Sequence, residues 1–151
     1  ALERPEAGRE DGADLAAACR FALGCCRFRL GDLGTAAETL REAGSSMGTA
    51  GLCFLDEDTD MVAFTRRIAH FYHHESCGQC TPCRDGTGWL AKLLTRIDEG
   101  EGNLRDLDLL LELCDQMEGR TVCALADAAA WPVRWGIRRF RGEFEAKCRP
   151  S

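Results

Sequence analysis

Residues 75–83 read ESCGQCTPC, a short stretch that separates two segments with helical periodicity. It holds three cysteines, Cys77, Cys80 and Cys83, with two residues between each cysteine and the next. A C-x2-C-x2-C turn can direct three thiolates at three irons of one cubane iron–sulfur cluster, whereas zinc sites usually use separated cysteine pairs. The spacing therefore favours a [4Fe–4S] cluster over zinc. Gly78 permits close approach of the backbone, and Arg84 supplies positive charge beside an anionic cluster.

A cubane with four thiolate ligands needs one more cysteine from elsewhere in the chain. The candidates are Cys53, Cys114, Cys123 and Cys148. Cys114 falls in the apolar stripe of a predicted helix and Cys53 in a predicted strand, so both are expected to be small buried residues. Cys148 lies three residues from the end, where chains fray. Cys123 lies in a non-periodic connection, GRTVCALADAAAWP (119–132), and is the predicted fourth ligand.

Four amphipathic segments around these cysteines predict a mainly α fold, with a small four-helix bundle over residues 59–147 that carries the cluster. The first helix is expected to begin at a cap on Asp58 or Thr59, and the second to end at Gly100. The third should begin at Asn103, with Asp106 completing the cap, and Gly119 lies beyond its end. The fourth should have Pro132 in its first turn.

One face of each predicted helix is apolar. The expected inward-facing residues are Met61, Phe64, Ile68, Phe71 and Tyr72 in the first helix; Trp89, Leu90, Leu93, Leu94 and Ile97 in the second; Leu107, Leu110, Leu111, Cys114 and Met117 in the third; and Val133, Ile137, Phe140 and Phe144 in the fourth.

Residues 31–58 have a different pattern and are predicted to be a short α/β remnant, the tail of a preceding small β-rich domain. A helix is expected over residues 35–44, ended by Gly44, and a buried strand within residues 51–58. Residues 1–30 lack clean helical or strand periodicity, and we expect them to be poorly ordered.

Composition limits the classes of function. The chain has 151 residues, with 19 basic and 25 acidic side chains and a net charge of −6, so nothing points to nucleic acid as a partner. Ten cysteines would suggest disulfides in a secreted protein. However, the apolar segment 15–26 is interrupted by Arg20 and follows an acidic stretch, unlike a signal peptide. With no run long enough to span a membrane, we expect an intracellular protein with reduced thiols.

Other side chains that could bind metal or react are expected to have no such role. His70, His73 and His74 precede the cysteine turn and are expected to be partly exposed helix residues rather than ligands. The adjacent pair Cys25–Cys26 is weak evidence for reactivity. Four arginines near the C-terminus are expected to form a solvated basic face: Arg134, Arg138, Arg139 and Arg141.

A series of motifs over residues 31–145 resembles the NADH-binding flavoprotein subunit of respiratory complex I. These motifs are AGSSMGTAGLCFLDEDT (43–59), ESCGQCTPCRDGTGWL (75–90), NLRDLDLL (103–110), TVCALADAAAWPV (121–133) and IRRFRGEFE (137–145). Related subunits occur in NAD-dependent formate dehydrogenases and NAD-reducing hydrogenases. Two features differ from the family: residues 1–30 fall outside the resemblance, and Ala126 stands where the family usually has glycine.

The resemblance implies that Cys77, Cys80, Cys83 and Cys123 hold one [4Fe–4S] cluster. In the family, this cluster takes single electrons from FMN reduced by NADH and passes them to further clusters. The family's glycine-rich FMN and NADH loop has no counterpart here, so the chain alone is expected not to oxidise NADH.

The expected partners of the chain are other subunits of the parent complex, without nucleic acid and without direct membrane insertion. Its expected location is cytoplasmic, peripheral to the inner membrane, or on the matrix side in mitochondria. The alternative is a zinc-binding or metal-free interaction domain without a redox role.

Overall fold

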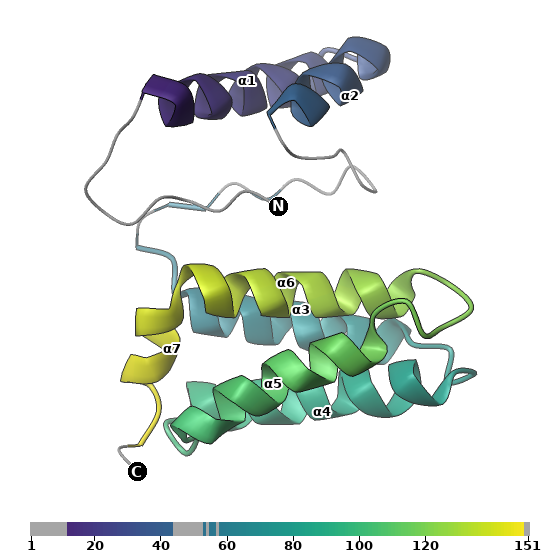
Figure 1. The fold of residues 1–151 in the computed structure, drawn as a ribbon, viewed down its shortest axis with the longest axis vertical. Coiled ribbons are helices and arrows are strands. Elements are labelled where there is room, and N and C mark those ends of the chain that lie inside the picture. The colour runs from purple at the N-terminus through teal and green to yellow at the C-terminus, as the bar shows by residue number, and fades with distance from the viewer. Residues whose placement is uncertain (1–11, 44–52, 54, 57, 150–151) are drawn as a thin grey trace. The chain divides into compact units, whose positions relative to one another are not determined.

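The computed structural model describes residues 12–43, 53, 55–56 and 58–149 (Figure 1). This part of the chain is mainly α, as predicted, and contains no named strand. The helices are α1 (Gly12–Arg29), α2 (Leu33–Glu42), α3 (Met61–Glu75), α4 (Thr81–Asp98), α5 (Leu104–Met117), α6 (Leu125–Arg139) and α7 (Arg141–Ala146). None of these helices is long and apolar enough to cross a membrane. The chain divides into two compact units, residues 1–56 and residues 57–151, which are described separately.

The first unit contains α1 and α2, which pack on each other. A helix over residues 12–29 was not expected from the sequence, because this segment lacks clean helical periodicity. Gly24 allows the close approach: a Cβ there would lie 2.8 Å from Cγ of Leu40. Arg27 Nη1 donates a hydrogen bond to Thr39 Oγ1 at 2.7 Å. The expectation for residues 1–11 lies outside the described residues.

The predicted strand within residues 51–58 does not appear where the chain is described. Cys53, Leu55, Asp56 and Asp58 are exposed and none is in a strand, so the predicted burial of Cys53 is wrong. The remaining residues of this stretch, and Gly44 after α2, lie outside the described residues. The predicted helix over residues 35–44 corresponds to α2, which begins two residues earlier, at Leu33, after the N-cap Asp32.

The second unit is built from α3 to α7 around one shared core. Helix α3 contacts α4 and α6, while α5 also contacts α4 and α6. The buried core side chains include Leu90, Leu94, Ile97, Leu107, Leu110, Cys114, Met117, Val133, Ile137 and Phe144. The α3–α4 and α5–α6 connections lie at one end of this unit, and the α4–α5 connection and α7 lie at the other (Figure 1). Consecutive helices therefore return the chain repeatedly to the same end.

Helix α3 buries a different face from the predicted one. Its buried residues are Val62, Thr65 and Ala69, while Phe71 is 57% exposed. These small side chains let neighbouring helices approach closely: a Cβ on Gly136 of α6 would lie 3.0 Å from Thr65 Oγ1. Trp89 in α4 is likewise exposed, contrary to expectation, although Leu90, Leu94 and Ile97 are buried as predicted.

The local signals that begin and end the helices are largely confirmed. Asn103 and Asp106 form the predicted capping box of α5, and the Asp106 side chain accepts from the Asn103 backbone N–H at 2.9 Å. Gly100 and Gly119 have positive φ values of 74° and 68° after α4 and α5. The predicted cap of α3 is wrong by one or two residues, because Asp60 is the N-cap and accepts from the N–H groups of Val62 and Ala63.

Helix α6 begins earlier than predicted, at Leu125, so Pro132 lies inside it rather than in its first turn. The reason is the alanine-rich segment 124–130, whose high helix propensity forms the turns that precede the proline. The predicted fourth helix also divides at Phe140, where α6 ends and α7 begins. Phe144 in α7 is nevertheless fully buried, as expected.

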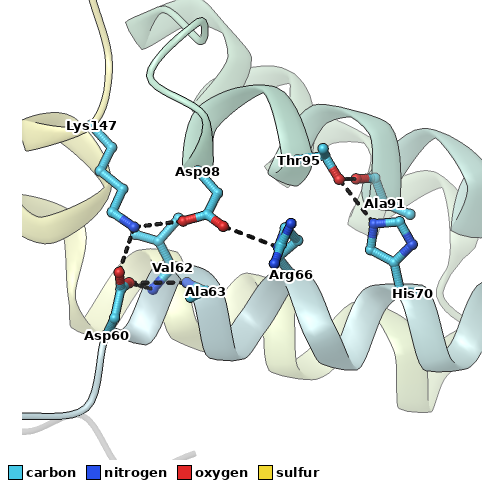
Figure 2. Close-up of polar contacts among 9 residues, drawn as sticks. All are labelled: Asp60, Val62, Ala63, Arg66, His70, Ala91, Thr95, Asp98 and Lys147. Carbon is cyan, nitrogen blue, oxygen red and sulfur yellow. Dashed lines mark hydrogen bonds and ion pairs between the residues drawn. The ribbon is translucent and has the colours of Figure 1, made fainter.

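A charged network fixes the end of the second unit that contains α7 (Figure 2). Lys147 Nζ donates to the carboxylates of Asp60, before α3, and Asp98, at the end of α4. Arg66 Nε lies 3.0 Å from Asp98 Oδ2. Hydrogen bonding from Lys147 lowers the pKa of Asp60, and backbone N–H groups at the start of α3 add to this effect. The network therefore joins α3, α4 and the segment after α7.

Candidate metal centre

The cysteine turn joins α3 to α4. Ser76 is the C-cap residue of α3, and Gly78 has a φ of 80°, a left-handed value that favours glycine. Cys80 is the N-cap residue of α4, and its side chain makes no capping hydrogen bond. Cys83 lies in the first turn of α4, with its N–H bonded to the Cys80 carbonyl at 3.1 Å. The turn thus places two of the three sulfurs at the positive end of the α4 dipole.

The three cysteines of the turn differ in exposure. Cys77 is exposed, Cys80 is half-buried against the core, and Cys83 is only 6% exposed within it. Cys83 Sγ lies 3.3 Å from the hydroxyl of Ser76. The Cys83 carbonyl accepts a hydrogen bond from the buried hydroxyl of Thr87 at 2.7 Å. Cys83 is therefore held at both its side chain and its backbone.

Arg84 also contributes to the geometry of the turn. Its Nη1 donates to the Gly78 carbonyl at 3.2 Å, across the loop that contains Cys77 and Cys80. Its Nε lies 3.1 Å from Asp85 Oδ1, in an exposed ion pair. The guanidinium thus lies beside the cysteine turn, as expected, although Asp85 offsets part of its charge.

Cys123 lies in the connection between α5 and α6, and its side chain is exposed. Hydrogen bonds fix the connection on both sides of it. Gly119 N–H donates to Asp127 Oδ1 at 2.6 Å, and Thr121 Oγ1 donates to the Cys123 carbonyl at 2.8 Å. Glu118 accepts from Trp131 Nε1 at 2.6 Å and from the guanidinium of Arg134. The backbone that presents Cys123 is therefore anchored to α6.

Chain topology brings the two cysteine-bearing connections to the same end of the second unit (Figure 1). Contact between α4 and α5 agrees with this arrangement, because a Cβ on Gly86 would lie 2.6 Å from Met117 Sδ. Gly86 follows Cys83 by three residues, and Met117 is the last residue of α5. Among the described residues, however, no three histidine, cysteine or acidic side chains are placed to hold a metal ion together.

Three other cysteines are at least partly buried in the structure. Cys114 is fully buried, its thiol donates to the Ala130 carbonyl at 3.4 Å, and burial raises its pKa to about 12. The prediction that it is a small buried residue is confirmed. Cys148 donates to the Phe144 carbonyl at 3.2 Å, and burial raises its pKa. Cys25 is buried in the first unit, where burial, and then its neighbour Cys26, raises its pKa.

The three histidines of α3 are all exposed. His70 Nε2 lies 2.9 Å from Thr95 Oγ1, and His73 Nδ1 lies 3.4 Å from Thr87 Oγ1.

The prediction of a solvated arginine face is wrong for Arg134, whose side chain is only 13% exposed and pairs with Asp115 and Glu118. These partners lie outside its own helix, so sequence spacing gave no signal for the pairing. The sequence also gave no signal for the contact of Ser76 with Cys83, because that contact depends on how the turn folds.

The C-x2-C-x2-C turn between α3 and α4 has the cysteine spacing of ligand runs that hold [4Fe–4S] clusters. A family model described as the NADH-ubiquinone oxidoreductase-F iron-sulfur binding region matches residues 63–147. The chain belongs to this family.

Curated relatives extend the similarity beyond the family match. The chain is 48% identical over 112 residues to the mitochondrial NADH-ubiquinone oxidoreductase 51 kDa subunit of Neurospora crassa, a match that covers 74% of this chain and 23% of that protein. It is 47% identical over 110 residues to the F subunit of NADH-quinone oxidoreductase from Rickettsia bellii, covering 73% of this chain and 26% of the relative. The chain thus spans about a quarter of the length of these relatives.

A solved structure of an NAD⁺-reducing [NiFe]-hydrogenase in the H2-reduced state has a similar fold, with a TM-score of 0.61. The two chains are 38% identical, and the match covers 64% of this chain and 17% of the hydrogenase chain. This similarity agrees with the predicted link between the complex I subunit and NAD-reducing hydrogenases.

Proposed function

We propose that the chain is the electron-transfer module of an NADH-oxidising flavoprotein subunit, a small four-helix bundle over residues 59–147 that carries one [4Fe–4S] cluster. Cys77, Cys80, Cys83 and Cys123 would be its ligands. A bound cluster of this kind supplies one-electron transfer. The observation that carries the proposal is the position of the two cysteine-bearing connections at one end of the α3–α7 unit (Figure 1).

The surroundings of the cysteine turn suit an anionic group. Thiolate ligands give a cubane cluster net negative charge, which the uncapped N-terminus of α4 and the guanidinium of Arg84 would offset. The core packs against Cys80 and Cys83, while Cys77 and Cys123 are each exposed. Because these two side chains are exposed, they are free to change rotamer, as binding of one cluster would require.

In the parent complex, we propose that electrons reach this region from reduced FMN and leave to clusters of partner subunits. Residues 31–58 would be the tail of a preceding β-rich domain, and residues 1–30 have no assigned role. The region would lie on the cytoplasmic side of the inner membrane, or on the matrix side in mitochondria. Because the sequence contains no glycine-rich FMN loop, this chain by itself is expected to leave NADH unoxidised.

An alternative function is a zinc-binding or metal-free interaction domain. One observation favours the metal-free form: among the described residues, no group of three potential ligands converges on a common point. The run of cysteines at consecutive x2 intervals argues against zinc, which more often uses separated pairs.

Anaerobic reconstitution of the whole chain with iron and sulfide separates these functions. We expect about four irons and four sulfides per chain, as a single cubane requires, and a paramagnetic signal after reduction with dithionite. NADH should give no such reduction of the isolated chain. Binding of zinc without sulfide, or of no metal, would overturn the electron-transfer function.

A further inference from the structure

The hydroxyl of Ser76 makes a polar contact with the sulfur of Cys83. The two atoms lie 3.3 Å apart, within hydrogen-bond range for sulfur. Ser76 is also half-buried, so its hydroxyl is partly shielded from water. The contact links the C-cap of α3 to the first turn of α4 across the cysteine turn.

The direction of this hydrogen bond follows from its neighbours. Gly78 N–H donates to Ser76 Oγ at 3.4 Å, so the serine oxygen already acts as an acceptor. A cysteine that ligates a metal is a thiolate, which has no proton and can only accept. The hydroxyl proton of Ser76 is therefore the one available to bridge the two atoms. When Cys83 is a thiolate ligand, the Gly78 N–H therefore occupies the serine oxygen as an acceptor and leaves the hydroxyl proton to bond the sulfur.

We propose that Ser76 is a positioning residue of the cluster site, which donates a hydrogen bond to the Cys83 thiolate, stabilises it as a ligand and raises the reduction potential of the cluster. The proposal rests on the proposed function. Reduction adds negative charge to a cluster, and a donor at a ligand sulfur stabilises the more negative state. Removing the donor should therefore make the cluster harder to reduce.

The position allows a matched pair of variants. Ser76 has φ −66° and ψ 123°, an extended conformation that β-branched residues adopt readily. Ser76→Thr keeps the hydroxyl, whereas Ser76→Val has nearly the same shape without it. Thr81→Val makes the same hydroxyl-to-methyl change at an exposed residue of the same turn. Differences between the Ser76→Thr and Ser76→Val proteins then report the hydroxyl alone.

The test is a redox titration of the reconstituted whole chain, followed by the paramagnetic signal of the reduced cluster. We expect the Val variant to favour the oxidised form about tenfold more than the wild type at a fixed solution potential, equivalent to about 59 mV for one electron. The Thr variant and Thr81→Val should titrate like the wild type. Loading of the Thr variant but not of the Val variant would also support the proposal, as loss of the stabilised ligand.

Equal loading and equal potentials for the Thr and Val variants would overturn the role of Ser76 while leaving the proposed function intact. If the added methyl group prevents loading in both variants, Ser76→Ala gives the comparison: a fall in potential supports the proposal and an unchanged potential overturns it. Failure of the wild-type chain to bind iron and sulfide would instead overturn the proposed function.

Discussion

Met117, the last residue of α5, packs directly on Gly86 of α4. A Cβ on Gly86 would lie 2.6 Å from Met117 Sδ and 2.7 Å from its Cγ, closer than such atoms can approach. Met117 is 1% exposed and cannot move aside into solvent. The contact lies about one turn beyond Cys83 and at the start of the connection that contains Cys123. It therefore helps to set the separation of the two cysteine-bearing connections.

Gly86→Ala should lower the free energy of unfolding by about 1 kcal/mol, because overpacking outweighs the better helix propensity of alanine. Urea denaturation followed by circular dichroism measures the change. In a Met117→Ala background, the same substitution should raise stability, since only the propensity gain remains. Gly142→Ala is the control, because a Cβ there meets nothing within 4 Å. Equal effects of Gly86→Ala in both backgrounds would contradict the packing argument.

Glu118→Gln should destabilise the chain by about 1–2 kcal/mol at neutral pH, because it weakens charged hydrogen bonds to the largely buried Arg134. Hydrogen bonds from Trp131, and then from Arg134, lower the pKa of Glu118 below its ordinary 4.5. Its contribution to stability is therefore complete above pH 4.5 and is lost as the pH falls through the lower folded-state pKa.

The difference in stability between the wild type and Glu118→Gln should accordingly shrink as the pH falls, since the protonated glutamate resembles glutamine. Glu112→Gln on the exposed face of α5 is the control and should change stability by less than about 0.5 kcal/mol. Chemical denaturation from neutral pH down to the acid transition measures both variants. A difference that stays constant with pH would show that the charge of Glu118 is not responsible.

Lys147→Met should lower stability by about 1–2 kcal/mol, because it removes charged hydrogen bonds to Asp60 and Asp98 (Figure 2). The pKa of Asp60 should also rise toward its ordinary 3.8, since hydrogen bonding from Lys147 is the largest cause of its lowering. Carboxyl ¹³C NMR measures that pKa. Lys92→Met, at an exposed site on α4, should change neither quantity; an unshifted Asp60 pKa in the Lys147 variant would contradict the network.

Sequence patterns predicted the features that depend on neighbouring residues. Asn103 and Asp106 form a cap because both partners lie within one turn, and Gly119 follows the end of α5 with a left-handed conformation that suits glycine. The cysteine turn was predicted between two helical segments, and it joins α3 to α4. Cys114 was correctly placed in the core, because its helix has a clear apolar stripe.

Features set by distant parts of the chain could not be predicted in this way. The buried face of α3 is made of Val62, Thr65 and Ala69, because close packing against other helices favours small side chains over Phe71. Arg134 is paired rather than solvated, because Glu118 reaches it from beyond its own helix. The contact of Ser76 with Cys83 likewise depends on the folded turn.

The identity of the fourth ligand is the central claim, and iron and sulfide analysis of two cysteine variants tests it most directly. Cys123→Ser should lose the intact cluster, because a hydroxyl is a harder and less acidic ligand than a thiol. Cys114→Ser should keep about four irons and four sulfides, and lose stability instead, because it puts a hydroxyl into an apolar core. Circular dichroism of both variants excludes general unfolding. A full cluster in the Cys123 variant, with loss of the cluster in a folded Cys114 variant, would contradict the account.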